Sequence, residues 1–293
     1  MRFHATIRVQ FFETFVSTIN SLASISETIC FHISMNGIMT CSMQADHTFS
    51  AYTEFKLDMF DNYLSESNTD NHIYIVFKTQ SFTKAMKNTK SVKSVNMKLS
   101  CYRGLPGLLF DMEMVDGINI RQDINVNVLQ QQEFSIYDEP SVTPPSLKLC
   151  VRKAKELRVV LSRMKIVDKT VKIEANNQGT LKVSSNNVAV LMETTFSSVF
   201  AVDTDMTTVI SIRMRIEIKS LMKALASIQS EPRAIHFCFN EVAMIIYVIM
   251  KRSVGSVTYY IPGQIMDDSF VYYYQEFILE SILPFVFQGH RKK

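Results

Sequence analysis

The sequence predicts an α+β protein of two pseudo-symmetric halves, each with short helices on one face of curved β-sheets. Three observations support this prediction. A unit of helix, strand, turn and strand occurs twice, more than a hundred residues apart; a segment with three prolines separates the two occurrences; and three of the four main expected helices carry Lys or Arg opposite their apolar side. Such internal repetition is typical of pseudo-symmetric architectures.

Bulk composition allows two domains but says little about partners. The chain has 293 residues, 47% of them hydrophobic, which is enough for one large or two ordinary cores. Its net charge of +3 is only mildly basic, so a nucleic-acid role must depend on where the basic residues lie. Five scattered cysteines without a CxxC spacing favour reduced thiols in the cytosol or nucleus over disulfides or a zinc site.

No targeting or membrane-spanning segment is expected. The first residues lack the apolar stretch of a signal peptide. The longest apolar run, Val242–Met250, has about half the length of a membrane span and is better explained as a buried strand.

The first unit of the fold is read from the N-terminus. Alternation over Phe3–Val9 predicts a strand, and apolar spacing over Phe11–Ile25 predicts a helix whose outer face is polar but uncharged. Ile29–Met35 and Met39–Met43 alternate again, and Asn36-Gly37 between them is typical of a hairpin turn.

A second helix is expected after a strand at Ile73–Lys78. Thr79 or Ser81 is a plausible cap for it, and Lys84 and Lys87 lie opposite its apolar side. Three further strands are predicted to complete the first half, at Val95–Cys101, Leu108–Val115 and Ile120–Leu129.

Gln130–Ser146 is the most linker-like stretch. Its prolines, Pro140, Pro144 and Pro145, disfavour both helix and sheet ladder, so an extended chain is expected. We therefore divide the chain into a first domain (1–129), a connecting loop (130–146), a second domain (147–263) and a C-terminal extension (264–293).

The second half repeats the plan of the first. Lys148–Val167 is predicted to be a helix with a basic face, followed by a hairpin of Val171–Ala175 and Leu181–Val183 in which Gly179 supplies the positive φ. A second helix at Lys219–Ile228 places Lys219 and Lys223 outward. The remaining strands are expected at Val188–Phe196, Val209–Ile218, Ala234–Phe239, Val242–Met250 and Val257–Ile261.

The basic helix faces suggest a function only when they are taken together. On a single helix, such a face is more often an ordinary solvated surface. If all four helices lie on one side of a continuous sheet, the basic faces line a single surface that suits phosphate attraction without base reading.

No catalytic or metal site is expected. The six histidines show no HxH or HExxH spacing, and acidic pairs such as Asp58 with Asp61 lack a third ligand or phosphate loop. Nothing resembles a nucleophile elbow, and Cys101 and Cys150 are better explained as small core residues.

Several stretches, in order, resemble a known family. They are Met1–Ile7, Thr79–Lys87, Lys172–Asn176 with Gly179–Lys182, Ile216–Lys219 with Leu221, Leu225 and Ala226, and Tyr260–Pro262. Together they resemble the sliding-clamp fold and, more specifically, the Hus-one family of subunits of the nine-one-one checkpoint clamp, from Met1 to about Gly263.

The resemblance implies a non-enzymatic subunit without cofactor, metal or membrane. Three related subunits (Rad-nine, Rad-one and Hus-one) would close into a ring around double-stranded DNA in the nucleus, with some protein cytoplasmic before assembly. A clamp loader of the replication-factor-C type would open the ring at damaged DNA, and the ring would recruit checkpoint and repair proteins. The linker would be the interdomain connecting loop, with apolar residues beneath it that could dock partner peptides.

Two sets of site residues are carried over by position from the resemblance. The DNA-facing residues would be Lys84, Lys87, Lys90, Arg152, Lys155, Arg158, Arg163, Lys165, Lys219 and Lys223. The subunit interfaces would use two sheet edges, Leu108–Val115 and Val188–Phe196, with Leu108, Leu109, Phe110, Met112, Met114, Val188, Val190, Met192, Thr194 and Phe196 at the contacts.

Two departures from the family leave alternatives open. The first helix has no basic residue on its outer face, and the chain continues after Gly263 with an aromatic-rich extension. The chain could instead be a self-associating processivity clamp resembling the proliferating cell nuclear antigen. From other classes, it could be a β-rich enzyme with an unrecognised site, or a membrane-peripheral scaffold using the aromatic extension.

Overall fold

The computed structural model describes residues 1–45, 49–87, 89, 91–152, 154–197, 199–201, 211–228 and 232–264. The predictions for Lys90 and for residues 265–293 lie outside this part of the chain. The first half contains β1 (Arg2–Ile7), α1 (Val9–Leu22), β2 (Thr28–Ser34), β3 (Gly37–Met43), β4 (Ser50–Lys56), β5 (Phe60–Glu66), β6 (Ile73–Lys78), α2 (Thr79–Ala85), β7 (Val92–Tyr102), β8 (Leu105–Met114), β9 (Asn119–Asn125) and β10 (Asn127–Leu129).

The second half follows a connecting segment that holds the short helix α3 (Gln131–Phe134). It contains β11 (Leu147–Val151), α4 (Ala154–Met164), β12 (Thr170–Asn176), β13 (Thr180–Asn186), β14 (Leu191–Phe196), β15 (Val199–Ala201), β16 (Ser211–Glu217), α5 (Ile218–Ser227), β17 (Ala234–Phe239), β18 (Ala243–Ile249) and β19 (Gly255–Gln264).

Antiparallel pairing joins the halves into a continuous structure. One sheet has the order β5-β1-β7-β8-β9. The other follows the path β10-β6-β2-β3-β4-β19-β16-β12-β13-β14, and β18, β17, β11 and β15 continue from β19. The link between halves is the β4–β19 pair, in which Ala51 lies opposite Tyr259.

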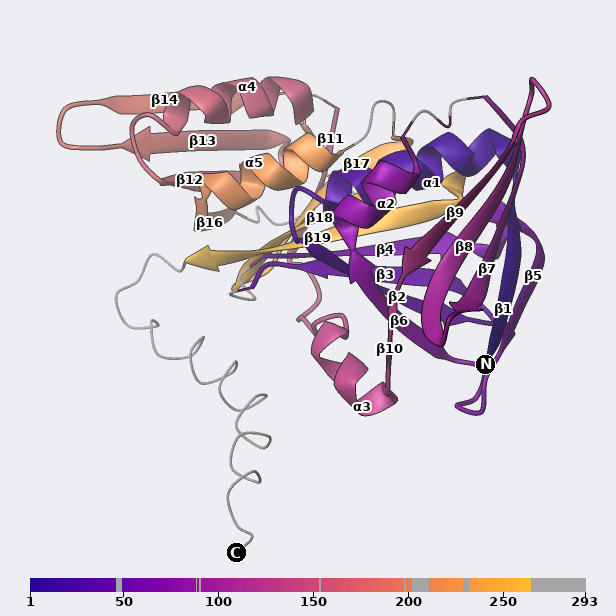
Figure 1. Ribbon diagram of the computed structural model, residues 1–293. Coiled ribbons are helices and arrows are strands. Elements are labelled where there is room, and N and C mark those ends of the chain that lie inside the picture. Colours follow the sequence, from indigo (N-terminus) through magenta and orange to yellow (C-terminus); the bar gives the residue numbers. More distant parts are fainter. Residues whose placement is uncertain are drawn as a thin grey trace, which may run out of the picture.

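The four long helices form one layer over the sheets. Contacts run in series from α2 to α1, from α1 to α5, and from α5 to α4 (Figure 1). In the first half, Phe15 of α1 packs against Phe55, Phe60 and Phe82, with the Phe15 and Phe55 ring centroids 4.8 Å apart. The linker helix α3 lies on the opposite side of the sheet from α1 and α2 (Figure 1).

Because side chains alternate along a strand, one face of the sheet packs against the helices and the other faces the linker. In β2, Ile29, Phe31 and Ile33 are fully buried in the main core beneath the helices, whereas Cys30 and His32 point to the linker side. The predicted hairpin turns are also present. Gly179 has a φ of 85°, and Gly37 has a φ of 130° with no room for a Cβ against the Phe55 carbonyl.

Several predicted boundaries were wrong. The first strand ends at Ile7, and Val9 already begins α1. The region predicted as one helix from Lys148 contains the strand β11, in which Leu147, Leu149 and Val151 are buried by alternation, and the helix α4 begins only at Ala154. The single strand expected at Ile120–Leu129 is split, because β9 pairs with β8 whereas β10 pairs with β6 in the other sheet.

The cap and linker predictions also need correction. The α2 helix begins after Lys78 without a side-chain cap; Thr79 is buried and its hydroxyl donates instead to the carbonyls of Ser26 and Glu27. The linker is not extended throughout, because Gln130 and Glu133 form a capping box that starts α3.

Candidate nucleic-acid and subunit interfaces

The predicted DNA-facing residues lie on or beside the helix layer. Lys84 and Lys87 lie on and just after α2, Arg152 and Lys165 flank α4, and the others lie within α4 and α5. All the described ones are exposed except Lys223, which is half-buried. Apart from Arg152, none of these side chains forms an ion pair within the described part of the chain. The side chains without an ion pair there are Lys84, Lys87, Lys155, Arg158, Arg163, Lys165, Lys219 and Lys223.

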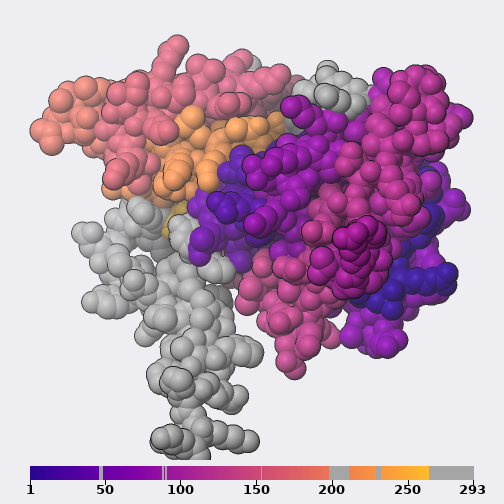
Figure 2. Space-filling model, viewed as in Figure 1, coloured from indigo at the N-terminus to yellow at the C-terminus, as the bar shows by residue number. Residues whose placement is uncertain are grey.

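The helix α1 interrupts this basic surface. It lies between α2 and α5, and its exposed side carries Glu13 and no Lys or Arg. Its hydroxyl groups are turned back on the helix: Ser17 donates to the Glu13 carbonyl at 2.5 Å and Thr18 to the Thr14 carbonyl at 2.7 Å. Figure 2 shows the second-half surface, in pink and orange, meeting the indigo and purple surface of the first half along this layer.

One of the two predicted sheet edges was wrong. Strand β8 is paired on both sides, with β7 and with β9, so Leu108–Val115 cannot form an open edge. Its residues are buried in the sheet: Leu108, Leu109, Phe110, Met112 and Met114 are each at most 9% exposed. This sheet ends at the next strand, β9, and at β5 on its other side.

The second predicted edge agrees with the topology. Among the described strands, β14 pairs only with β13 and ends its branch of the sheet, and it contains Met192, Thr194 and Phe196. Val188 and Val190 precede the strand in a turn, where Asn187 Oδ1 accepts hydrogen bonds from the N–H groups of Ala189 and Val190 at 2.9 and 2.7 Å.

The linker covers an aromatic surface on the side away from the helices. The Phe134 ring stacks on Tyr74 at 4.4 Å, and the Tyr52 hydroxyl donates to the Asp138 carbonyl at 3.0 Å. Tyr260 donates to the Glu139 carboxylate at 2.7 Å. A groove of about 710 Å³ opens beside Tyr137. Ile136 and Tyr137 of the linker line this groove.

Burial dominates the electrostatics beneath the linker. It raises the pKa of the Cys41 thiol to about 12, and it raises the pKa values of Cys30, Tyr52 and Tyr260 as well. Burial, together with the neighbouring His72, lowers the pKa of His32 to about 4. Since both thiols stay protonated at neutral pH, Cys30 and Cys41 lack the thiolate character of nucleophiles.

Neither a metal centre nor a membrane-spanning helix is found in the described part of the chain. No group of three or more His, Cys, Asp or Glu side chains there is placed to hold a metal ion. No described helix combines the length and apolar character needed to cross a bilayer.

Two antiparallel halves with a helix layer on one face, and with β9 and β14 among the strands that end the sheets, define the sliding-clamp class. Solved structures agree on this fold. The chain is similar to proliferating cell nuclear antigen from Thermococcus kodakaraensis (TM-score 0.67, 16% identity, covering 89% of this chain and 100% of the other). It is also similar to the antigen from Entamoeba histolytica (TM-score 0.72, 12% identity, covering 89% and 98%).

Sequence comparison identifies the family within this class. The Hus1-like protein family matches residues 1–265, and the chain belongs to this family. It is 25% identical to the checkpoint protein hus1 homolog of Dictyostelium discoideum over 211 residues, covering 70% of this chain and 77% of the relative. It is 22% identical to the human checkpoint protein HUS1 over 261 residues, covering 83% and 92%. The chain is therefore a checkpoint sliding-clamp subunit, and both its fold and its family are those of non-catalytic scaffolds.

Proposed function

We propose that this chain closes with Rad-nine-like and Rad-one-like subunits into a heterotrimeric ring that encircles double-stranded DNA at damage sites. The observation that carries the proposal is the helix layer, whose exposed cations face away from the sheets between two open strand edges. Apart from Arg152, these cations have no ion-pair partner in the described part of the chain, so they are available to neutralise phosphates, and such contacts read no base sequence.

The two edges favour a ring over a simple pair. Strand β14 lies at the far left of Figure 1, whereas β9 belongs to the five-stranded sheet at the right. Two different edges give head-to-tail contacts, and such contacts form a ring when the rotation closes. Each contact would add a strand of the neighbouring subunit to β9 or β14.

The other partners follow from the proposed ring. A clamp loader of the replication-factor-C type would open it, and checkpoint and repair proteins would dock on its outer surface, with the linker groove as one peptide site. This work takes place in the nucleus, the protein being partly cytoplasmic before assembly. The chain acts as a scaffold and carries out no catalysis. The connecting loop at 130–146 divides its two domains.

Co-purification followed by sizing tests the proposal. We expect the isolated chain to be monomeric and to form a 1:1:1 complex with Rad-nine-like and Rad-one-like subunits. The complex should remain on a closed DNA circle after loading and leave when the circle is cut. A stable trimer of this chain alone would support the self-associating clamp instead, and failure to be retained on the circle would contradict encirclement.

A further inference from the structure

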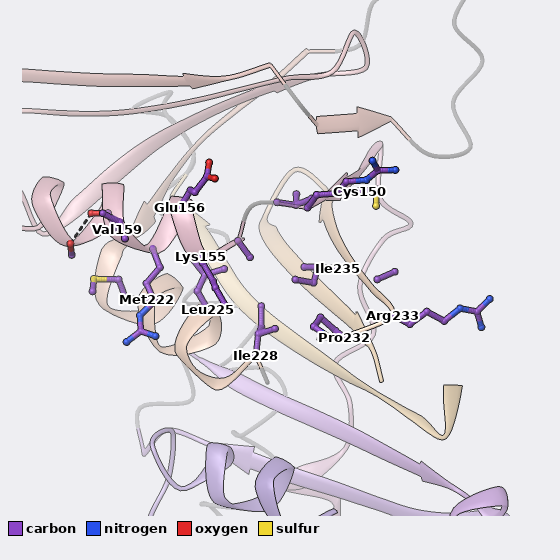
Figure 3. Close-up of a pocket in the computed structure, with 16 residues that line it drawn as sticks. Cys150, Lys155, Glu156, Val159, Met222, Leu225, Ile228, Pro232, Arg233 and Ile235 are labelled. Carbon is purple, nitrogen blue, oxygen red and sulfur yellow. Dashed lines mark hydrogen bonds between the residues drawn. The ribbon is translucent and has the colours of Figure 1, made fainter. Parts of the chain in front are cut away.

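The helix-layer surface of the second half contains a hollow, which contact with the phosphates of a DNA duplex does not require. It lies between α4, α5 and the start of β17, with a volume of about 1080 Å³ (Figure 3). This volume is at the upper end of the range for small-molecule sites. The hollow adjoins the basic residues of α4 that belong to the proposed DNA-facing surface.

The walls of the hollow differ in chemistry. The α4 side carries Lys155 and Arg158, both exposed, together with the exposed carboxylate of Glu156, and Arg152 precedes the helix (Figure 3). The opposite side and the floor are apolar, formed by Met222, Leu225, Ile228, Pro232 and Ile235 (Figure 3).

Two further residues complete the lining: one brings apolar surface to the α4 side, and the other carries a charge that is directed elsewhere. Val159 is 54% exposed at the mouth of the hollow, on the same helix as the cations. Arg233 does not add its charge to the apolar side: its guanidinium donates to the Ser253 hydroxyl, and the side chain extends away from the hollow (Figure 3).

These features fit an unpaired strand better than a duplex. A duplex offers only phosphates to such a hollow because its base faces are stacked inside. An unpaired strand offers phosphates and exposed base faces together, and the base faces gain from contact with an apolar wall. An acidic peptide would use the cations but would leave the apolar wall without a matching surface.

We propose that this hollow binds a single-stranded segment of nucleic acid next to the encircled duplex. Phosphates lie against Lys155 and Arg158, and one or two bases lie against Val159, Met222 and Ile235. The inference rests on the proposed function for the location of the duplex, and it adds a preference for DNA that carries an unpaired stretch.

The test uses the full-length isolated chain, so it does not depend on ring formation. A labelled twelve-nucleotide single strand and a blunt duplex of the same length are compared by fluorescence anisotropy at low salt. The variant Val159→Asn with Met222→Gln removes apolar surface without changing charge. We expect it to weaken single-strand binding roughly tenfold and to change duplex binding less than twofold.

Two matched variants complete the test. Lys155→Glu with Arg158→Glu should weaken binding of both DNAs, whereas Lys84→Glu on α2 with Lys87→Glu just after it should spare the single strand. If the double polar variant does not fold, Val159→Ala should still lower single-strand affinity two- to threefold.

Three results would overturn the inference. They are equal binding of single strand and duplex by the unmodified chain, equal losses for both DNAs in the polar variant, and a poly-glutamate peptide binding as tightly with the same sensitivity to Val159. Loss of retention on circular DNA, by contrast, would contradict only the proposed ring.

Discussion

The two halves share one backbone plan but use their inner helices differently. In the first half, α1 buries six residues, among them Phe11, Phe12 and Phe15, and the exposed charge that it presents is the acidic Glu13, contrary to the uncharged face expected from the sequence. In the second half, α4 buries four smaller residues and presents Lys155, Arg158 and Arg163. The fold therefore determines only the position of each helix. The side chains then decide whether it contributes mainly to packing or to charge.

The largest expected effect concerns packing. Phe15→Ala should lower the free energy of unfolding by about 4 kcal/mol, because a fully buried ring in an aromatic cluster leaves a cavity that its neighbours cannot fill. Leu161→Ala in α4 should cost about 3 kcal/mol. Chemical denaturation measures both. A greater loss for Leu161→Ala would reverse the proposed difference between the halves.

The next effect concerns charge in the second half. Reversing Lys155, Arg158 and Lys223 to Glu should reduce DNA affinity roughly 100-fold at low salt. The slope of log affinity against log salt concentration should become shallower by the equivalent of about three phosphate contacts. Binding measured at several salt concentrations checks this, with circular dichroism to confirm folding. Severe unfolding would mean that these side chains are packed and do not line a DNA surface.

A matched control separates position from total charge. Lys98, Lys172 and Lys182 lie on strand positions pointing away from the core, and each has an acidic partner: Asp111, Glu174 and Glu193 respectively. Reversing all three changes the net charge by the same amount. These pairs are only partly exposed, and each new Glu would face its acidic partner, so stability should fall modestly at each pair. DNA affinity should nevertheless fall much less than in the helix variant.

The open edge of the second half offers a backbone test. The Asn187 N–H bonds to the Val190 carbonyl, so alternation in an antiparallel pair turns the N–H groups of Glu193 and Thr195 to the open side of β14. Thr195→Pro should then weaken assembly with a partner subunit roughly tenfold and leave monomer stability almost unchanged. Thr194→Pro, in contrast, should destabilise the monomer. Unchanged assembly of Thr195→Pro would argue against β14 as a contact edge.

The smallest effect is expected from adding positive charge to α1, the first-half helix that has no Lys or Arg on its exposed side. Glu13→Lys with Ser17→Lys would place two cations one turn apart on α1, making the inner surface more even. DNA affinity should rise roughly fivefold at low salt, and the gain should disappear at high salt. The neutral change Glu13→Gln should give a smaller gain. No gain from the lysine pair would show that α1 does not face the DNA.

Much of the fold was predictable because local patterns define it. Ile73–Lys78 and Ala234–Phe239 were predicted with their observed bounds, and both hairpins have their glycine where a positive φ is needed. Strand β4 was missed for a physical reason. Five of the seven residues of Ser50–Lys56 are buried, all except Glu54 and Lys56, so no clear alternation marks the strand.

The candidate site was predictable only in part. Helical spacing identified the outward cations, and their exposure agrees with the prediction. Spacing could not identify the edge of the first sheet, because alternation tells which face a residue occupies and not which strand lies beside it. The residues alone therefore could not tell which of the strands β8 and β9 lies at the edge of the sheet. The hollow beside α4 was missed because its walls come from segments about 70 residues apart.

Neighbouring residues are enough to specify the repeated helix and strand plan, the basic sides of three helices and the family resemblance, because their spacing fixes local conformation and face. The three-dimensional arrangement adds that β9 and β14 end their sheets where β8 does not. It also adds that α1, which has no Lys or Arg on its exposed side, interrupts the basic surface, and that α4, α5 and β17 enclose a hollow. Such features depend on pairing and packing between distant segments, and no local pattern records which segments meet.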